Sequence, residues 1–512
     1  MKHDLTRRGF LAASAAMAAT TVLPRGAYAQ ATPLTLTAAT RVIEVGGRAA
    51  TVMGLANGTG KQGLILDPGQ RFRVDLTNAL DEETIIHWHG QIPPNVQDGV
   101  PDLPMPLLKP GETRSYDYAA MPGTFWMHSH VPVQEMSLLA APLIVRRPED
   151  LTSDRQEVVM FLHDFSFRPA ADVLAEITEG AAHHDVGNMG ATMQGPGGML
   201  GMDHSGIAMG GMMSGGSGHM NMAGGMNMGG MGAGGMEMDL NDFDFDAYLV
   251  NDRSLADPEV ITVERKGRIL LRVINAAAAT SFWIDTGGIP ARLVAVDGHA
   301  VEPMAGTRFG LAMAQRLDLE IDLPGAGAFP IIALREGARE RTGLILATSG
   351  AEIRRMDDLS ETESGAFDID LSQEAALRAA RPEGAPALPP RAVDRSHQIM
   401  LGGAMQPYLW TINGQVWGNH TPITAKTGER VHLTFHNMSM MGHPMHLHGH
   451  VFQVVNINGR DIDGAVRDTV YVPPMTMVTI ALDAGEAARW MLHCHHMPHL
   501  STGMMTEFAV SA

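Results

Sequence analysis

Short runs of alternating apolar and polar residues, separated by Gly, Pro, Asn and Asp, recur along most of the 512-residue chain. Examples are RFRVDLTN (71–78), GRILLRVIN (267–275) and MVTIALDAG (477–485), whereas stretches with helical periodicity are scarce. Because successive side chains of a strand point to opposite faces, this alternation is typical of half-buried β-strands. The pattern predicts an all-β protein built of sandwiches or barrels.

Three stretches share one arrangement, a glycine turn followed by an apolar strand that ends in Asn. They are DPGQRFRVDLTN (67–78), ERKGRILLRVIN (264–275) and KTGERVHLTFHN (426–437). The arrangement predicts one β-domain repeated three times, and a chain of this length suits about three domains of ~150 residues each. We expect the domains at 30–150, 151–353 and 397–512, with a charged and then Pro/Ala-rich linker at 354–396.

Residues 189–238 interrupt the second predicted domain with 14 of the 37 methionines and 18 glycines. Since no periodic core can be built from this composition, we interpret the segment as a low-complexity insertion. Thioether sulfur is a soft ligand that suits Cu(I). Candidate Cu(I) ligands mix Met and His at short spacing, and an inert linker is the alternative interpretation. These candidates are Met202, His204, Met209, Met212 and Met213.

The N-terminal sequence MKHDLTRRGFLAASAAMAATTVLPRGAYAQ has the basic, apolar and A-x-A regions of a signal peptide. The arginine pair predicts twin-arginine export, with removal of residues 1–29 and a periplasmic location. A short membrane anchor is the alternative, but the apolar stretch is below the roughly 20 residues that a spanning helix needs. The net charge of −19 argues against nucleic acid as a partner.

More than half of the 23 histidines fall in four clusters: HWHG (87–90), HSH (128–130), HPMHLHGH (443–450) and HCHHMPH (493–499). The fourth cluster contains Cys494, the only cysteine, which cannot form an internal disulfide. On a strand, His493 and His495 point to one side and Cys494 to the other. If each side faces a metal, two metal sites are joined by a few covalent bonds, which suits electron transfer.

The residues around Cys494 predict a blue-copper site. His499, Met504 and the separate His443 supply a His₂Cys set with a weak thioether ligand, which is the arrangement of copper electron-transfer sites. Zinc is the alternative metal, but it does no redox chemistry. The remaining histidines can hold three further copper ions between which a small molecule binds. They are His87, His89, His128, His130, His446, His448, His493 and His495.

At this point the sequence resembles the multicopper oxidases, because it contains their motifs HxHG, HxH, HxxHxH and HCHxxxHxxxxM in the same order. It is most similar to bacterial laccase-like enzymes and periplasmic copper-efflux oxidases. The resemblance covers nearly the whole chain after the signal peptide. It implies three cupredoxin-like Greek-key β-sandwich domains, a structural second domain and four copper ions.

The resemblance also assigns the ligands. It implies a type 1 copper at His443, Cys494, His499 and Met504, and a type 2 copper at His87 and His446. One type 3 copper would bind His89, His128 and His495, and the other His130, His448 and His493. It further implies that His443 carries the exposed edge of the type 1 site, with Met441 near the site where Cu(I) binds.

Some members of this family feed protons to the trinuclear site through acidic residues. Asp98, eleven residues after His87, matches one of these acids. A second acid commonly follows the last histidine of the HCHxxxH motif, which is His499 here, but this position is occupied by Leu500. Glu135, close behind HSH, is the candidate replacement. Solvated loop carboxylates are the alternative interpretation of both acids.

We therefore expect a monomeric enzyme that oxidises Cu(I), and phenols incidentally, with O₂ as the electron acceptor. Stable membrane insertion is not expected. Two alternatives stay open: a general laccase that acts on phenols, and a protein that mainly sequesters copper through the Met-rich insertion.

Overall fold

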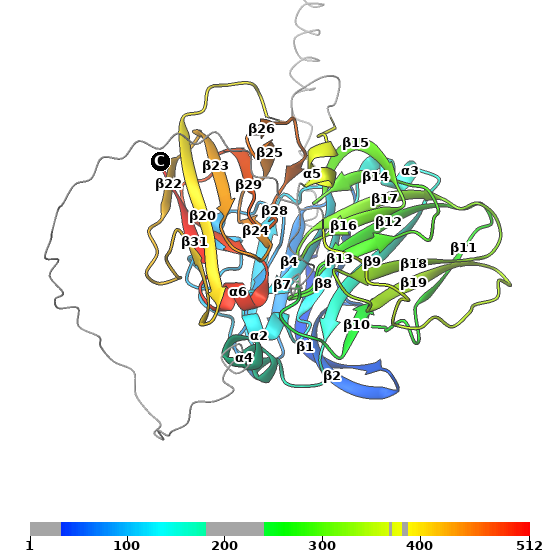
Figure 1. Ribbon diagram of the computed structural model, residues 1–512. Helices are drawn as coiled ribbons and strands as arrows, with labels where there is room; N and C mark the ends of the chain where they lie inside the picture. Colours follow the sequence, from blue (N-terminus) through cyan, green and yellow to red (C-terminus); the bar gives the residue numbers. More distant parts are fainter. Residues whose placement is uncertain (1–31, 181–239, 368–370, 381–387) are drawn as a thin grey trace, which may run out of the picture.

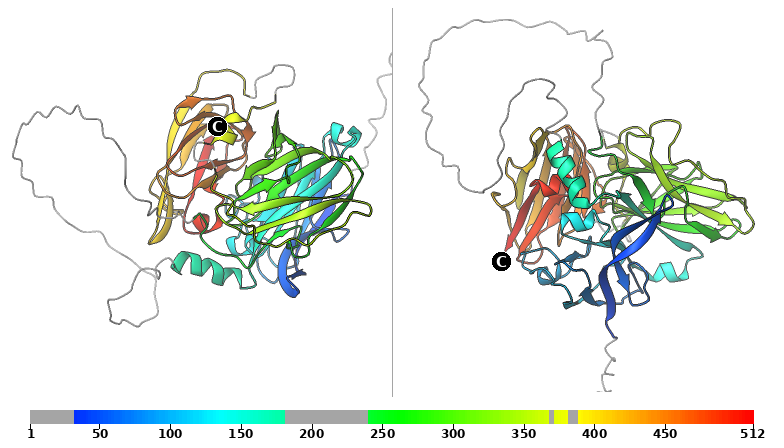
Figure 2. Two further views of the ribbon diagram at one scale, coloured as in Figure 1. Left: turned by 45° about the vertical axis from the view of Figure 1, so that its right-hand side comes forward. Right: turned by 90° about the horizontal axis from the view of Figure 1, so that it is seen from below.

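The computed structural model describes residues 32–180, 240–367, 371–380 and 388–512. Its strands form six sheets, which make three β-sandwiches in chain order and confirm the all-β prediction. Figure 1 shows the first sandwich in blue and cyan, the second in green and the third in yellow to red. Seen from below in Figure 2, each sandwich touches the other two. The predicted signal peptide and the Met-rich insertion, with its candidate Cu(I) ligands, lie outside the described residues.

The first sandwich packs a sheet of order β2-β1-β4-β6 against one of order β3-β8-β7-β5, around a core that contains Trp88 and Phe125. A 3-10 helix, η1 (Asn95–Gln97), and the helices α2 (Pro132–Glu135) and α3 (Pro148–Thr152) accompany it. The strands are β1 (Leu34–Val45), β2 (Arg48–Asn57), β3 (Leu64–Leu66), β4 (Phe72–Asn78), β5 (Ile86–His87), β6 (Thr113–Tyr118), β7 (Gly123–Ser129) and β8 (Ala140–Val145).

The second sandwich has sheets of order β10-β9-β12-β17-β14-β15 and β11-β19-β18-β13-β16. Helix α4 (Ala170–Gly180) leaves it after β9 and packs Val173 and Ile177 into the core of the third sandwich. The strands are β9 (Gln156–Phe165), β10 (Ala247–Val250), β11 (Val260–Val263), β12 (Arg268–Asn275), β13 (Phe282–Asp285), β14 (Ala291–Val296), β15 (His299–Gly306), β16 (Arg308–Leu311), β17 (Arg316–Asp322), β18 (Ala328–Arg335) and β19 (Arg341–Thr348).

The third sandwich has sheets of order β21-β20-β23-β29-β25-β26 and β22-β31-β30-β24-β28, and β27 pairs with β25. Helix α5 (Ser372–Ala376) precedes it and α6 (Met497–Ser501) follows β30. The strands are β20 (Arg395–Met405), β21 (Tyr408–Ile412), β22 (Ile423–Lys426), β23 (Arg430–Asn437), β24 (His443–Leu447), β25 (Phe452–Ile457), β26 (Arg460–Asp461), β27 (Val466–Arg467), β28 (Thr469–Val472), β29 (Met477–Asp483), β30 (Arg489–Cys494) and β31 (Met505–Ser511).

The asparagine that ends each repeated stretch has the same task in all three sandwiches. The side-chain amides of Asn78, Asn275 and Asn437 are buried at the ends of β4, β12 and β23. Each donates from Nδ2 to a distant backbone carbonyl at 2.9–3.1 Å, and each accepts at Oδ1 the N–H of the residue two positions on. Since a buried amide is costly unless it is hydrogen-bonded, these bonds explain why the repeat ends in Asn.

Glu336, in the turn between β18 and β19, makes the stability of the second sandwich depend on pH. Burial raises the pKa of this carboxyl from 4.5 to about 7, although the N–H of Phe367 donates to its Oε1 at 2.6 Å. Because folding raises the pKa of this acid, the folded protein loses stability as the pH rises from 4.5 to 7. Since one pKa unit corresponds to about 1.4 kcal/mol, the loss is roughly 3 kcal/mol.

We therefore expect Glu336→Gln to be more stable than the wild type at pH 8 and about equally stable at pH 4.5, because Gln still accepts from Phe367. Urea unfolding at the two pH values measures this. An equal urea midpoint for both proteins at pH 8 would contradict the prediction.

Candidate metal centres

Cys494, the last residue of β30, lies in a buried cluster with two imidazoles. Its Sγ is 3.7 Å from Nδ1 of His443, at the start of β24, and 3.7 Å from Nδ1 of His499, on α6. The two Nδ1 atoms are 3.2 Å apart, and all three residues are fully buried. Three candidate ligand atoms thus converge on one point, as the sequence predicts for the type 1 site.

Backbone hydrogen bonds bring Met504 to the same place. The N–H of Cys494 donates to the carbonyl of Met504 at 3.1 Å, and the N–H of Met504 donates to the carbonyl of His499 at 3.0 Å. Met504 itself is fully buried, in the hydrophobic core that includes Cys494. A thioether held beside a His₂Cys set matches the donor chemistry of a blue-copper site.

The expectation that His443 carries an exposed edge is wrong for this chain. His443 is fully buried, because Trp410 lies over both imidazoles, with ring centroids 5.2 Å from His443 and 4.0 Å from His499. Nε2 of His443 is 2.8 Å from the hydroxyl of Ser439. Met441 is also buried, in the same core as Cys494.

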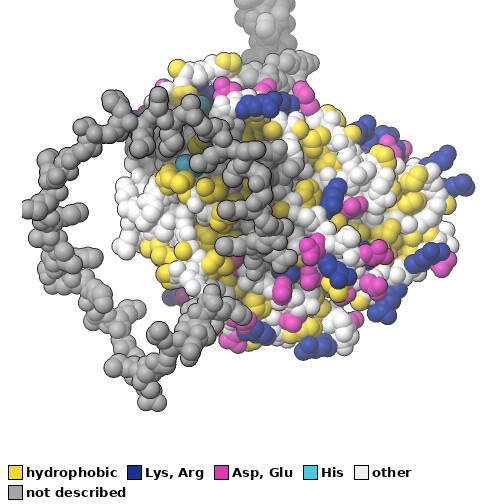
Figure 3. All heavy atoms as spheres, in the orientation of Figure 1, with side chains coloured by type: hydrophobic (Ala, Val, Ile, Leu, Met, Phe, Trp, Pro, Cys, Tyr) yellow, Lys and Arg dark blue, Asp and Glu magenta, His cyan; other side chains and the backbone are white. Residues whose placement is uncertain are grey.

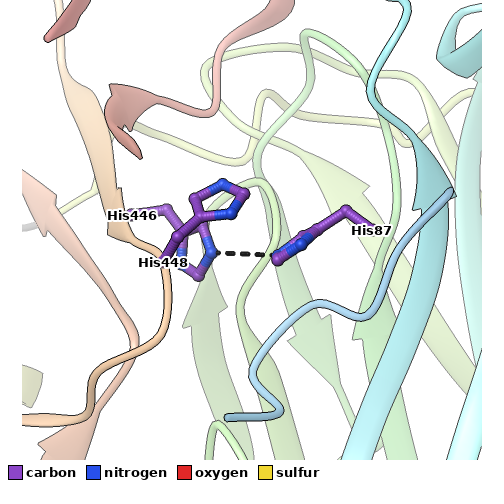
Figure 4. A group of neighbouring side chains, drawn as sticks. All are labelled: His87, His446 and His448. Atoms are coloured by element: carbon purple, nitrogen blue, oxygen red, sulfur yellow. Dashed lines mark hydrogen bonds between the residues drawn. The ribbon is translucent and has the colours of Figure 1, made fainter. Parts of the chain in front are cut away.

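The eight other predicted ligands meet in one cluster between the first and third sandwiches. Strand pairing brings them together, because His87 is the partner of His128 in the first sandwich and His446 is the partner of His493 in the third. Across the interface, Nε2 of His87 lies 3.4 Å from Nε2 of His446, drawn as the dashed line in Figure 4, and the ring of His448 lies beside that of His87 with centroids 3.9 Å apart. The strand alternation thus places His493 here and Cys494 in the other cluster.

The six rings that the resemblance assigns to the type 3 ions lie close together within each predicted trio. His89, His128 and His495 have ring centroids 5.0–5.6 Å apart. His130, His448 and His493 have centroids 5.2–5.3 Å apart. These distances bring all six rings together without deciding which ion each ring binds.

Most of these histidines have one nitrogen tied to a fixed acceptor, which leaves the other nitrogen free to face the cluster. Nδ1 of His87 donates to the carbonyl of Asp98, and Nδ1 of His446 donates to the carbonyl of Asp468, both at 2.8 Å. Nδ1 of His493 donates to the carbonyl of Cys494 at 2.9 Å. Because a carbonyl can only accept, each of these rings carries its proton on Nδ1 and its lone pair on Nε2.

The inward nitrogens fit metal ions. The Nε2 lone pairs of His87 and His446 face each other at 3.4 Å, which is repulsive unless a cation lies between them. Burial lowers the pKa of both imidazoles, so both are neutral, which is the ligating form. Further inward nitrogens have no hydrogen-bond partner among the described residues. They are Nδ1 of His89 and Nε2 of His128, His130 and His495.

Asp98 contacts histidines of two sandwiches. Its carbonyl accepts from His87, while its Oδ2 is 2.8 Å from Nδ1 of His448. The carboxyl group is buried, and burial raises its pKa to about 8. Asp98 is therefore not the solvated loop carboxylate of the alternative interpretation.

Glu135, on α2, lies between two predicted ligands of one type 3 ion. Its Oε2 is 2.8 Å from Nδ1 of His128, and its Oε1 is 3.7 Å from Nδ1 of His495. The side chain is buried. The structure thus places the candidate replacement for the acid expected at Leu500 against the histidine cluster.

Asp468 and Arg316 also contact the site and were not predicted from the sequence. Oδ1 of Asp468 is 3.1 Å from Nε2 of His89, and its carbonyl accepts from His446. Its carboxylate pairs with the guanidinium of Arg316, which comes from β17 of the second sandwich. Arg316 also donates to the carbonyl of Thr124 in the first sandwich at 3.2 Å. The charged pair at the start of RDTVYV (467–472) was the available signal for Asp468.

The sequence analysis also missed Asp242, two residues after the described chain resumes at Leu240. Its buried Oδ2 accepts the hydroxyl proton of Tyr408 and is 3.6 Å from Nε2 of His499. On the other side of the undescribed segment, α4 packs against α6, which carries His499. The described residues before and after the undescribed segment thus contact the neighbourhood of the Cys494 cluster, through α6 on one side and His499 on the other.

Comparisons with known proteins agree with this arrangement. Three family models described as multicopper oxidase match residues 37–150, 229–351 and 391–512. Multicopper oxidase MmcO of Mycobacterium tuberculosis is 30% identical over 447 residues, which cover 86% of this chain and 79% of that protein. Copper resistance protein A of Escherichia coli is 24% identical over 612 residues, which cover 95% of this chain and 94% of that protein.

Solved structures show the same fold. Fet3p, described as a multicopper oxidase that functions in iron import, matches with a TM-score of 0.70 at 16% identity, over 93% of this chain and 90% of that chain. A multicopper oxidase of Campylobacter jejuni matches with a TM-score of 0.63 at 19% identity, over 93% of this chain and 91% of that chain. The three sandwiches are thus cupredoxin-like domains. The chain belongs to the multicopper oxidase family, whose members are copper-dependent oxidoreductases.

Proposed function

We propose that this protein is an oxidase that couples the oxidation of Cu(I) to the reduction of O₂ in copper tolerance. Four Cu(I) ions give up one electron each, and O₂ takes these four electrons and four protons to become two waters. The observation that carries the proposal is the position of Cys494, whose thiol joins one cluster while the adjacent His493 belongs to the other. A few covalent bonds thus connect the site that accepts electrons to the site that binds O₂.

The donor sets support the family's ligand assignment. His443, Cys494, His499 and Met504 would hold the type 1 copper, and His87 and His446 the type 2 copper. His89, His128 and His495 would hold one type 3 copper, and His130, His448 and His493 the other. When bound, these four ions supply the redox centres that store four electrons.

The protein's own residues keep both sites ready. The carbonyls of Asp98, Asp468 and Cys494 fix the imidazoles in the tautomer that ligates. Trp410 excludes water from the Cys494 cluster. Asp98 and Glu135 are buried acids that contact the histidine cluster, and Asp468, a further buried acid there, is paired with Arg316. We therefore assign the delivery of protons to reduced O₂ to Asp98 and Glu135.

Asp98→Asn tests the proton delivery. Asn can still accept the hydrogen bond from His448, but it cannot pass on a proton, so we expect O₂ turnover at saturating reductant to fall roughly 100-fold or more. An oxygen electrode measures this, and Asp117→Asn, which changes an exposed acid of the same sandwich, is the control. Unchanged turnover with the copper content intact would remove Asp98 from the mechanism.

The soft thioether ligands of the Met-rich insertion favour Cu(I) as the reductant. Of the described residues on either side of that insertion, α4 packs against α6 and Asp242 lies beside His499. A relative is named copper resistance protein A. The twin-arginine signal would place the enzyme in the periplasm. Among the described residues, no helix has the length and hydropathy needed to cross a membrane.

Purified protein decides between the candidate functions. We expect four coppers per chain, an intense visible thiolate-to-copper absorption, and a larger kcat/KM for Cu(I) than for phenols. A larger kcat/KM for phenols would favour a general laccase. Deletion of residues 189–238 tests sequestration: the oxidase proposal requires loss of Cu(I) turnover with dye oxidation spared. If cellular copper tolerance instead depends on the insertion whether or not the oxidase is active, sequestration is the main function.

A further inference from the structure

The exposed methionines of the described chain are confined to the third sandwich. Of the large hydrophobic side chains at its surface, six are methionines, and all fall between residues 400 and 477. Figure 3 shows hydrophobic and histidine side chains at the surface over this sandwich. An exposed thioether loses the benefit of burial, so a core-packing role does not explain these residues. They are Met400, Met405, Met438, Met440, Met475 and Met477.

Strand register sets two of these methionines on either side of a histidine. Met400 of β20 is the partner of His436 of β23, and His436 is the partner of Met477 of β29. All three side chains are on the outer face, because the next residues along, Ile399, Phe435 and Val478, are buried. In the antiparallel pair, the directly opposed His436 and Met477 have Cβ atoms about 4.5–5.5 Å apart, and the parallel strands β20 and β23 lie about 4.7–4.9 Å apart, so the three side chains are within reach of one shared ion.

The neighbouring row of the same face shows that its side chains meet across the strands. Thr434 and Thr479, two residues from His436 and Met477, are hydrogen-bonded to each other through their hydroxyls at 3.0 Å. This row, with Gln398, contains no charged side chain. Hard divalent cations prefer carboxylate oxygen, whereas two thioethers and an imidazole suit a soft monovalent ion.

We propose that Met400, His436 and Met477 form a surface binding site for Cu(I), through two sulfurs and one imidazole nitrogen. As the site that first receives the reductant, it rests on the proposed cuprous oxidase function. The site is distinct from the four predicted copper sites, none of whose ligands it contains.

The loop that follows His436 connects this row to the type 1 cluster. Asn437 donates from Nδ2 to the carbonyl of Met441 at 2.7 Å and accepts the hydroxyl of Ser439 at 2.8 Å. The same hydroxyl is 2.8 Å from Nε2 of His443. A short, hydrogen-bonded loop therefore runs from the proposed site to a type 1 ligand, and the exposed Met440 lies along it. An ion bound at the row is positioned to move inward or to pass on an electron.

Silver(I), a soft monovalent ion that the enzyme cannot oxidise, tests binding on the full-length holoenzyme. A sulfur that binds Ag(I) is protected from sulfoxidation, so dilute hydrogen peroxide and peptide mass spectrometry give the oxidation rate of each methionine. Met405 is the internal control, because it is as exposed as Met400, at 39%, but points to the other side of β20. We expect saturating Ag(I) to slow oxidation of Met400 and Met477 strongly and of Met405 little. His436→Gln should remove that protection, and equal protection of all three methionines would overturn the site.

Kinetic measurements then distinguish a failure of this site from a failure of the proposed function. In the Met400→Leu/Met477→Leu variant, which keeps side-chain volume but removes sulfur, we expect KM for Cu(I) to rise several-fold while oxidation of an organic dye is unchanged. Met405→Leu is the matched control. If Ag(I) protects Met400 and Met477 in an enzyme that does not oxidise Cu(I), the site is supported and the oxidase proposal is contradicted. If the enzyme oxidises Cu(I) normally but Met400 and Met477 are not protected, the oxidase proposal is supported and the site is contradicted.

Discussion

A Cys494→Ser protein is expected to be colourless and to consume no O₂. The serine hydroxyl stays protonated at neutral pH and is a hard ligand, so the visible thiolate-to-copper absorption is lost with the soft donor. The connection between the buried His443–His499 pair and the histidine cluster is lost as well. Absorption spectroscopy measures the colour and an oxygen electrode measures O₂ consumption. Copper analysis should find one copper fewer per chain.

The matched control for this prediction is Met504→Leu. It removes the other sulfur of the cluster but leaves Cys494, so the protein should remain coloured. Its type 1 potential should be higher, because an axial thioether donates to Cu(II) and an aliphatic side chain does not. A Cys494→Ser protein that keeps both colour and oxidase activity would refute the proposed electron path.

Arg316→Met is expected to destabilise the protein strongly. The buried guanidinium is bonded to the carboxylate of Asp468 and lies 3.7 Å from that of Asp297. Removing it leaves the buried carboxylate of Asp468 without its charged partner, which typically costs about 3–5 kcal/mol, whereas Asp297 keeps Arg467 at 2.8 Å. Because Asp468 also contacts His89 and His446, the variant should bind less copper at the histidine cluster.

Urea unfolding of the copper-free protein and copper analysis after reconstitution measure these two effects. Arg292→Met is the control, since Arg292 makes a surface pair with Glu320 and should contribute no more than about 1 kcal/mol. If the two variants unfold at the same urea concentration, Arg316 does not have the structural role inferred here.

Local sequence predicts what strand alternation and short spacing determine. The placement of His493 and Cys494 in different clusters follows from neighbouring positions on β30, and the three repeated stretches predict three sandwiches. Arg316, 152 residues from its partner Asp468, has no such local signal. The Met400–His436–Met477 row depends on the register of three strands, which sequence spacing alone does not determine.

The burial of His443 shows a second limit on what can be predicted from the sequence. The residue that covers it, Trp410, belongs to β21, a strand of the opposite sheet. Resemblance carried over the identity of the ligand, but not the side chains packed around it. Coordination chemistry is conveyed by a motif, whereas access to it is decided by packing between distant segments.

Asp98 joins the first and third sandwiches through a single residue, with its carbonyl on His87 and its carboxyl group on His448. A hinge motion between these two sandwiches would break the pair of contacts and pull the ligands of one centre apart. The proposed oxidase would therefore work as a rigid frame. Dioxygen would enter, and water would leave, by diffusion between side chains and not through separation of the two sandwiches.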